Sequence, residues 1–233
     1  MDLKDKLYIL TGGSSGLGKA MALSLIAEGA EVIITGRDKD KLDQVAAEIG
    51  ADGFHADVNS DADIEALYEW VRNKYNRLDG LINNAGIGDW AELDQMLRDK
   101  MKHVFETNVF GATMMASHAA KIFKAQKFGD IVNIASTASL KGYKMGSIYA
   151  ASKFALRGLS QCWQAELRPY NVRVIQINPS EVPTAFAKVD RVEKPLEDNK
   201  LTPQEIADTL ISALKMDRRG FIPEVTVFAT NPF

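Results

Sequence analysis

Short apolar runs rich in β-branched residues alternate along the chain with longer segments of helical periodicity. The apolar runs are LYIL, EVIIT, GFHAD, LDGLIN, GDIVNIAS, VRVIQIN and GFIPEVTVF, and turn residues bound them. Such runs are typical of strands buried in a parallel sheet. Helices are predicted between them at 16–28, 39–49, 60–75, 97–126, 147–168 and 203–216. This alternation predicts an α/β fold, a doubly wound Rossmann-type parallel sheet of about seven strands with helices on both faces.

No long polar linker interrupts the alternation, so we expect residues 1–233 to form a single domain. An α/β fold often exceeds about 200 residues as one unit. Ligands bind such sheets beyond the carboxyl ends of the strands. The strand-to-helix turns are therefore where functional residues are expected.

The composition and charge of the chain restrict its partners. Hydrophobic residues make up 46% and charged residues 25%, as in ordinary globular proteins. A net charge of -3 without a basic run argues against nucleic acid as a partner. No apolar stretch approaches the length of a membrane span, and no signal peptide is recognisable, so no membrane partner is expected.

The cysteine and histidine content bears on compartment and metal binding. The single Cys162 cannot form an internal disulfide, which favours a reducing, cytoplasmic location. His55, His103 and His118 have no ligand partners at a suitable spacing. No metal site is therefore expected.

The first strand-to-helix turn is rich in glycine and reads TGGSSGLG from Thr11. Glycine allows a tight turn and brings backbone N–H groups to a pyrophosphate at a helix N-terminus. The alternative is a turn that needs glycine only for its backbone. The spacing G-x-x-x-G-x-G differs from the more familiar dinucleotide fingerprint G-x-G-x-x-G. The candidate cofactor contacts in this turn are Gly12, Ser14, Ser15, Gly16, Leu17 and Gly18.

The stretch SIYAASKFA places Tyr149 and Lys153 four residues apart in a predicted helix. Residues i and i+4 lie on one helix face, so this phenol and this ammonium can meet the same ligand. A pairing by chance is the alternative, because the chain contains six tyrosines.

With TGGSSGLG, the NNAG of residues 83–86 and Tyr149-x-x-x-Lys153 in this order, nearly the whole chain resembles the short-chain dehydrogenase/reductase family, compact subtype. Ser136 and Asn108 precede Tyr149 by 13 and 41 residues, as the resemblance leads one to expect. The resemblance implies an NAD(P)-dependent oxidoreductase that interconverts a carbonyl, either a ketone or a β-keto group, and a secondary alcohol.

The resemblance also implies four catalytic residues, Asn108, Ser136, Tyr149 and Lys153. Tyr149 would exchange a proton with the substrate oxygen, and Lys153 would lower the pKa of the phenol while contacting the nicotinamide ribose. Ser136 would donate a hydrogen bond to the substrate oxygen, with Ser139 as the weaker candidate. Asn108 would hold a water that links Lys153 to solvent. Its alternatives are a helix side chain turned to solvent or bonded to its own backbone.

The resemblance also implies cofactor contacts in the later strand-to-helix turns. Asp57 would accept from the adenine amino group, with helix capping as its alternative, and Val58 would supply a backbone N–H. The nicotinamide end would be held by Pro179, Val182 and Thr184, and the cofactor ribose by Asn84, Ala85 and Gly86. Ser180 stands where the family usually has glycine, which raises the question whether this position needs a positive φ.

The end of the second strand bears on which nicotinamide cofactor is used. An acid there usually binds the ribose hydroxyls of NAD, whereas a cation suits the 2′-phosphate of NADP. Gly36 occupies the acid position and Arg37 follows, so NADP(H) is predicted to be preferred, with NAD(H) possible. The alternative is that Arg37 is a solvated loop charge with Asp38 beside it. Ser15 occupies a position where many NADP-preferring relatives carry a second basic residue.

A small-molecule carbonyl or alcohol is the expected substrate. Trp90, Tyr143, Met145 and Phe186 are candidates for its pocket or, equally, for the core, and the polar segment 185–200 is short for a lid. The resemblance implies assembly through the small-residue helix around Ala155 into a homotetramer, or a dimer. A catalytically silent dinucleotide-binding sensor is the alternative function. A nucleotide-sugar epimerase would need a second substrate domain.

Overall fold

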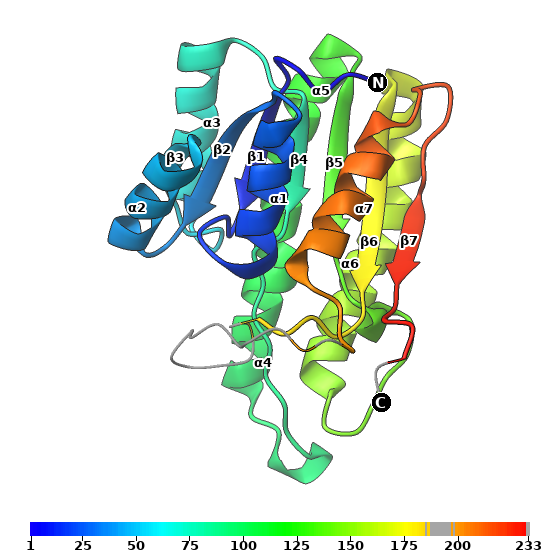
Figure 1. Cartoon of the computed structure of the whole chain (residues 1–233). Coiled ribbons are helices and arrows are strands. Elements are labelled where there is room, and N and C mark those ends of the chain that lie inside the picture. The colour runs from blue at the N-terminus through cyan, green and yellow to red at the C-terminus, as the bar shows by residue number, and fades with distance from the viewer. Residues whose placement is uncertain (185, 187–196, 198, 232–233) are drawn as a thin grey trace.

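The computed structural model of the chain describes residues 1–184, 186, 197 and 199–231. Parallel strands form one sheet in the order β3-β2-β1-β4-β5-β6-β7 (Figure 1). The strands are β1 (Leu7–Thr11), β2 (Glu31–Gly36), β3 (Asp52–His55), β4 (Gly80–Asn83), β5 (Gly129–Ile134), β6 (Val172–Pro179) and β7 (Glu224–Val227). The predicted seven-stranded, doubly wound sheet is confirmed.

Helices cover both faces of the sheet. They are α1 (Gly16–Ala27), α2 (Lys39–Ile49), α3 (Asp61–Tyr75), α4 (Arg98–Phe105), α5 (Ala112–Gln126), α6 (Ser147–Leu167) and α7 (Pro203–Lys215). Short 3-10 turns occur at η1 (Leu93–Gln95), η3 (Thr137–Ser139) and η4 (Arg168–Tyr170).

The apolar residues of the inner strands β1, β2, β4, β5 and β6 are divided between two cores. Tyr8 and Leu10 of β1 pack with α1, α2 and α7, whereas Leu7 and Ile9 pack with α3, α5 and α6. Because successive strand residues point to opposite faces, a run of apolar residues serves both layers at once. This arrangement explains why the inner strands carry apolar residues on both faces.

The predicted helix at 97–126 is not continuous. A π-helical segment, η2 (Glu106–Gly111), separates α4 from α5. Within it the Asn108 side chain binds the backbone of Ile87, and Gly111 lies so close to Val58 that an added Cβ would be 2.7 Å from the Val58 carbonyl oxygen. These tertiary contacts favour the wider turn, which the helical periodicity alone does not reveal.

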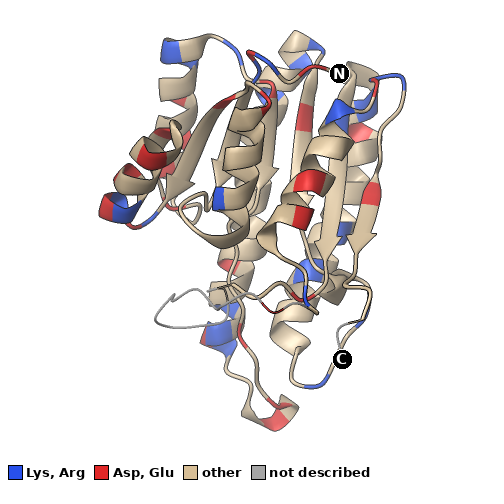
Figure 2. Ribbon diagram, viewed as in Figure 1, with Lys and Arg blue, Asp and Glu red and all other residues tan. Residues whose placement is uncertain are grey.

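Charged residues of both signs are interspersed over the helices and strands (Figure 2). No helix in the part of the chain that the structure describes is long and apolar enough to cross a lipid bilayer.

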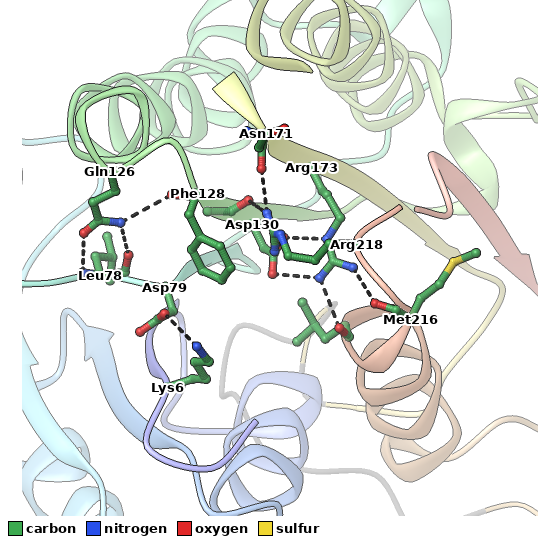
Figure 3. Close-up of polar contacts among 12 residues, drawn as sticks. Lys6, Leu78, Asp79, Gln126, Phe128, Asp130, Asn171, Arg173, Met216 and Arg218 are labelled. Carbon is green, nitrogen blue, oxygen red and sulfur yellow. Dashed lines mark hydrogen bonds and ion pairs between the residues drawn. The ribbon is translucent and has the colours of Figure 1, made fainter. Parts of the chain in front are cut away.

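A buried ion network lies at the end of the sheet where the strands begin (Figure 3). Asp130 on β5 accepts from Arg173 Nε at 2.7 Å and Nη2 at 2.8 Å, and from Arg218 Nη1 at 3.0 Å. Arg173 also donates to the carbonyl oxygens of Leu214 and Met216 and thereby caps the C-terminal end of α7. The network therefore joins β5, β6, α7 and the segment that leads into β7.

We expect Asp130→Asn to lower the free energy of unfolding by about 3–5 kcal/mol, because the Arg173 guanidinium would stay buried without its counter-charge. Urea denaturation followed by circular dichroism measures this loss. Asp217→Asn is the matched control, since Asp217 and Arg219 form an exposed ion pair, and it should leave the midpoint unchanged. Equal midpoints for wild type and Asp130→Asn would contradict the role given to the network.

Candidate active site

The glycine turn connects β1 to the N-terminus of α1. Gly12 and Gly16 have φ values of +68° and +50°, which favour glycine. A Cβ on Gly18 would lie 2.1 Å from the Gly12 carbonyl oxygen, so the helix can approach the turn only with glycine there. Ser15 occupies the N-cap, but its side chain makes no capping hydrogen bond. The positive end of the α1 dipole is therefore directed to the space in front of the turn.

Hydrogen bonds tie this turn to the end of β4. The Thr11 hydroxyl accepts from the backbone N–H groups of Asn84 and Ala85, each at 3.0 Å. The Asn84 amide donates to the carbonyl oxygens of Thr11 at 2.9 Å and Gly12 at 3.1 Å. The sequence analysis did not single out Thr11, although it opens the TGGSSGLG motif.

A cavity of about 1070 Å³ extends from the glycine turn across the carboxyl ends of the strands. All of the predicted cofactor contacts line it: Gly12, Ser14, Ser15, Gly16, Leu17, Gly18, Arg37, Asp57, Val58, Asn84, Ala85, Gly86, Tyr149, Lys153, Pro179, Val182 and Thr184. The close-packed turn, the N-terminus of α1 beside it and the size of the cavity fit a dinucleotide.

Two cations lie where the cavity reaches β2. Arg37 is exposed, and its side chain has no hydrogen bond or ion pair with the described residues. The Asp38 carboxylate accepts from the Lys41 backbone N–H at 3.1 Å and caps α2, so it is engaged away from Arg37. Lys41 lines the same cavity and was not predicted. Its position four residues after Arg37, at the start of a helix, is the signal that could have found it.

Asp57 lies at the cavity wall after β3. Its Oδ1 accepts from the Asn59 N–H at 3.0 Å within a local turn. The capping role belongs instead to Ser60, which accepts from the Asp63 N–H at the N-terminus of α3. The alternative assignment of Asp57 as a helix cap is therefore wrong.

Ser136, Tyr149 and Lys153 come together in the cavity. Ser136 follows β5 and accepts from the Ala138 N–H at 3.1 Å. The Lys153 ammonium donates to the Ile134 carbonyl oxygen at 2.9 Å and lies 5.7 Å from the centre of the Tyr149 ring. Three of the four predicted catalytic residues thus share one site.

Ser139, the weaker serine candidate, does not line the cavity. It is fully buried, and its hydroxyl donates to Asn178 Oδ1 at 3.0 Å. Its role in the described structure is to satisfy a polar group between β5 and β6.

The electrostatics of Tyr149 differ from the prediction. Burial raises the pKa of the Tyr149 hydroxyl well above its ordinary value, and the hydrogen bond with Ser136 opposes this effect. Lys153 contacts the ring and does not lower the pKa of the phenol. Burial also lowers the pKa of Lys153 to about 8. Burial is the largest cause of the raised pKa of Tyr149, and the charge of Lys153 is not among the causes, so the predicted lowering of this pKa by the lysine is not seen in this structure.

Asn108 is separated from the other three candidates. Its side chain is buried, with Oδ1 accepting from the Ile87 N–H at 2.9 Å and Nδ2 donating to the Ile87 carbonyl oxygen at 2.8 Å. Nδ2 also donates to Ser152 Oγ at 3.0 Å, and Ser152 donates to the Tyr149 carbonyl oxygen at 2.7 Å. The side chain is neither turned to solvent nor bonded to its own backbone. It connects the loop after β4 to the first turn of α6.

Ser180 has a regular backbone in place of the family glycine. Positive φ values among the described non-glycine residues occur elsewhere, and the Ser180 N–H donates to the Val227 carbonyl oxygen at 2.8 Å. Serine is therefore accommodated without strain. Most of the polar segment 185–200, which is short for a lid, lies outside the described residues.

Three of the four candidate pocket residues, Trp90, Tyr143 and Phe186, line the cavity. Met145 does not, because it lines a neighbouring hollow of about 520 Å³. Met145 therefore lines a pocket, as predicted, but not the one that contains Tyr149. Among the described residues, no three His, Cys, Asp or Glu side chains are grouped so that they could hold a metal ion.

Comparison with known proteins gives consistent matches. The family model described as short chain dehydrogenase matches residues 6–194. An uncharacterized oxidoreductase of Staphylococcus aureus is 32% identical over 228 residues, which cover 97% of each chain.

Two solved structures extend the comparison. The alcohol dehydrogenase of the archaeon Thermococcus sibiricus, complexed with 5-hydroxy-NADP, has a TM-score of 0.89 at 25% identity and 97% coverage of each chain. The 3-ketoacyl-(acyl-carrier-protein) reductase of Brucella melitensis, complexed with NADH, has a TM-score of 0.89 at 26% identity. That match covers 99% of this chain and 100% of the reductase.

We expect Lys153→Met to stabilise the fold near neutral pH. A pKa lowered from 10.5 to about 8 by burial corresponds to a cost of about 3 kcal/mol for holding the charged amine inside the fold. Loss of the hydrogen bond to Ile134 offsets about 1 kcal/mol of the gain. Urea denaturation at pH 7 should therefore show a net gain of about 2 kcal/mol.

The gain should shrink as the pH rises from about 8 to 10.5, because the folded wild type loses the proton in that range while the unfolded chain keeps it. Lys102→Met, at an exposed lysine of α4, is the control and should change little. A Lys153→Met protein that is less stable than wild type at pH 7 would argue against the desolvation cost.

Proposed function

The chain belongs to the short-chain dehydrogenase family and is an NAD(P)-dependent oxidoreductase, and from this premise we propose that it interconverts a ketone or β-keto group and a secondary alcohol with NADP(H), using Tyr149 as acid and base. One observation carries the proposal. The cavity that opens at the glycine turn and at Arg37 also contains Ser136, Tyr149 and Lys153.

The described residues suggest how the cofactor would be held. The N-terminus of α1 would receive the pyrophosphate, Asp57 and Val58 the adenine, and Lys153 the nicotinamide ribose. Pro179, Val182 and Thr184 line the end of the cavity where the nicotinamide would lie. When bound, NADPH supplies the hydride for the carbonyl carbon.

Side chains of the protein would supply the proton that the substrate oxygen gains. The phenol of Tyr149 keeps its proton at neutral pH, since the ordinary pKa of tyrosine is near 10 and burial raises it further, and it can donate this proton to the oxygen of a carbonyl that is being reduced. The Ser136 hydroxyl would donate a second hydrogen bond as negative charge develops on that oxygen. This environment favours the reductive direction, since alcohol oxidation needs the phenolate.

The preference for NADP(H) rests on Arg37 and Lys41. NADPH should bind at least about ten times more tightly than NADH, because a guanidinium without an ion-pair partner among the described residues gains a charge-assisted contact only with the 2′-phosphate. Fluorescence titration measures both affinities. Arg37→Ala should remove most of the difference.

Lys39→Ala is the matched control for Arg37→Ala. Lys39 lies on the same turn but pairs with Asp43 at 2.5 Å and does not line the cavity. Its loss should leave the cofactor preference intact. Equal affinities of the wild type for NADPH and NADH would refute the assignment of NADP.

We further propose a single-domain protein that works in the cytoplasm on a small molecule and assembles as a homotetramer. Exposed apolar side chains support the assembly: Phe110 on η2, Met114 on α5 and Phe154 on α6 are 54%, 37% and 43% exposed. Gly158 on α6 leaves room for close helix contact, since an added Cβ would meet no atom within 4 Å.

Sedimentation velocity at micromolar concentration should show a tetramer, because these apolar side chains would otherwise face water. Phe154→Asp should shift the population to smaller species. A wild type that sediments only as a monomer would rule out this assembly.

Tyr149→Phe should reduce turnover by a factor on the order of 100 or more, because it removes the proton donor and leaves the ring in place. NADPH affinity should stay nearly unchanged, which fluorescence titration checks. Lys153→Ala should weaken both turnover and cofactor binding. Wild-type turnover in Tyr149→Phe would show that the tyrosine is not the acid, and a wild type without turnover on any ketone would favour a silent dinucleotide sensor.

A further inference from the structure

Aromatic side chains surround Tyr149 at the end of the cavity opposite Arg37. The ring centre of Trp90 lies 5.9 Å from that of Tyr149, and the ring centre of Phe186 lies 5.6 Å from it. Trp90 and Phe186 are themselves 6.5 Å apart with their planes at 83°. The phenol is therefore flanked by one ring from the loop after β4 and one from the segment after β6.

The rings of Trp90 and Phe186 form an aromatic wall beside Tyr149. Tyr143 supports the Trp90 side of this wall. Trp90 Nε1 donates to the Tyr143 hydroxyl at 2.8 Å, which uses the one polar hydrogen of the indole. The backbone N–H of Ala91 donates to the Met145 carbonyl oxygen at 3.2 Å and joins the two loops that carry the rings. Met145 has a φ of +65°, a conformation that a non-glycine residue adopts only at a cost.

Two glycines make room for these rings. A Cβ on Gly88 would lie 2.4 Å from the Trp90 ring, and a Cβ on Gly146 would lie 2.5 Å from the Tyr143 ring. Each ring therefore lies flat against a backbone that has no side chain. The wall is preorganised by the backbone, and a substrate does not have to create it.

Charges lie at the rim of this end of the cavity. Lys141 is exposed, and Glu181 is paired with Lys200 at 2.8 Å. Among the described residues that line the cavity, the other cations are Lys153, beside Tyr149, and Arg37 and Lys41 at the far end. The rings of Trp90 and Phe186, which flank Tyr149, themselves offer no charged partner to a carboxylate or phosphate on the substrate.

Resting on the proposed function, we propose that the substrate is an uncharged aryl-substituted ketone whose ring packs against Trp90 and Phe186 while its carbonyl oxygen faces Ser136 and Tyr149. An aromatic ring gains from face and edge contacts with these walls beyond the area that it buries. In the reaction the carbonyl carbon gains a hydride and the oxygen gains a proton. The ketone becomes a secondary alcohol and NADPH becomes NADP⁺.

The test compares three ketones with NADPH. Benzylacetone carries a phenyl ring two methylenes from its carbonyl, so the ring does not change the reactivity of the carbonyl. Its cyclohexyl analogue matches it in size, and levulinate carries a carboxylate at the same distance. Wild type should have a kcat/KM for benzylacetone about threefold or more above that for the cyclohexyl analogue and far above that for levulinate.

Variants of Trp90 test whether the aromatic wall causes the preference for the phenyl ketone. Trp90→Ala should abolish the phenyl preference and raise KM by about tenfold with a smaller change in kcat, because the wall binds the substrate and does not react. Trp90→Phe should restore most of the preference. Trp70→Ala is the matched control, since Trp70 on α3 packs against Phe54 and Tyr75 outside the cavity.

Equilibrium dialysis of the alcohol product of benzylacetone reports on the wall without turnover. Binding that weakens in Trp90→Ala but not in Trp70→Ala supports the proposed aromatic wall. If such binding is seen but no ketone is reduced, the proposed function is wrong while the aromatic wall stands. Reduction of all three ketones without a phenyl preference overturns the aryl substrate and leaves the proposed function standing. A preference for levulinate, or binding that is unaffected by Trp90→Ala, also overturns it.

Discussion

The hydrogen bonds between Thr11 and the end of β4 hold the site at the point where the strand order reverses. β1 and β4 are neighbours in the sheet, but the helices that follow them lie on opposite faces, so the chain must diverge there. The Thr11 hydroxyl and the Asn84 amide bind the two diverging turns to each other. The glycine turn can then open toward a ligand without losing its position, as expected at a topological switch point.

Burial governs the chemistry of the site more than local charge does. The rings around Tyr149 exclude water, which raises the pKa of the phenol, and the same burial lowers the pKa of the Lys153 amine. Both shifts favour the neutral forms. Keeping an amine at this depth lowers the stability of the fold.

Much of this arrangement could be predicted from the sequence, and the exceptions have a common cause. The strands and the residues of the glycine turn follow from local patterns, because apolar runs and glycine requirements act within a few residues. The π-helix around Asn108 and the pKa of Tyr149 depend on Ile87, Trp90 and Phe186, which are distant in the chain. Spacing indicated that Asn108 matters, but only the fold shows that its side chain fastens two segments together.

The ion network of Asp130, Arg173 and Arg218 (Figure 3) lies where the strands begin, whereas the cavity lies at the carboxyl ends of the strands. The loops after β4, β5 and β6 can therefore acquire substitutions without touching the contacts that fasten the strands at their other end. Such a separation makes a scaffold tolerant of change where specificity is decided. Directed evolution toward new substrates should accordingly find its productive positions in the loops that carry Trp90 and Tyr143.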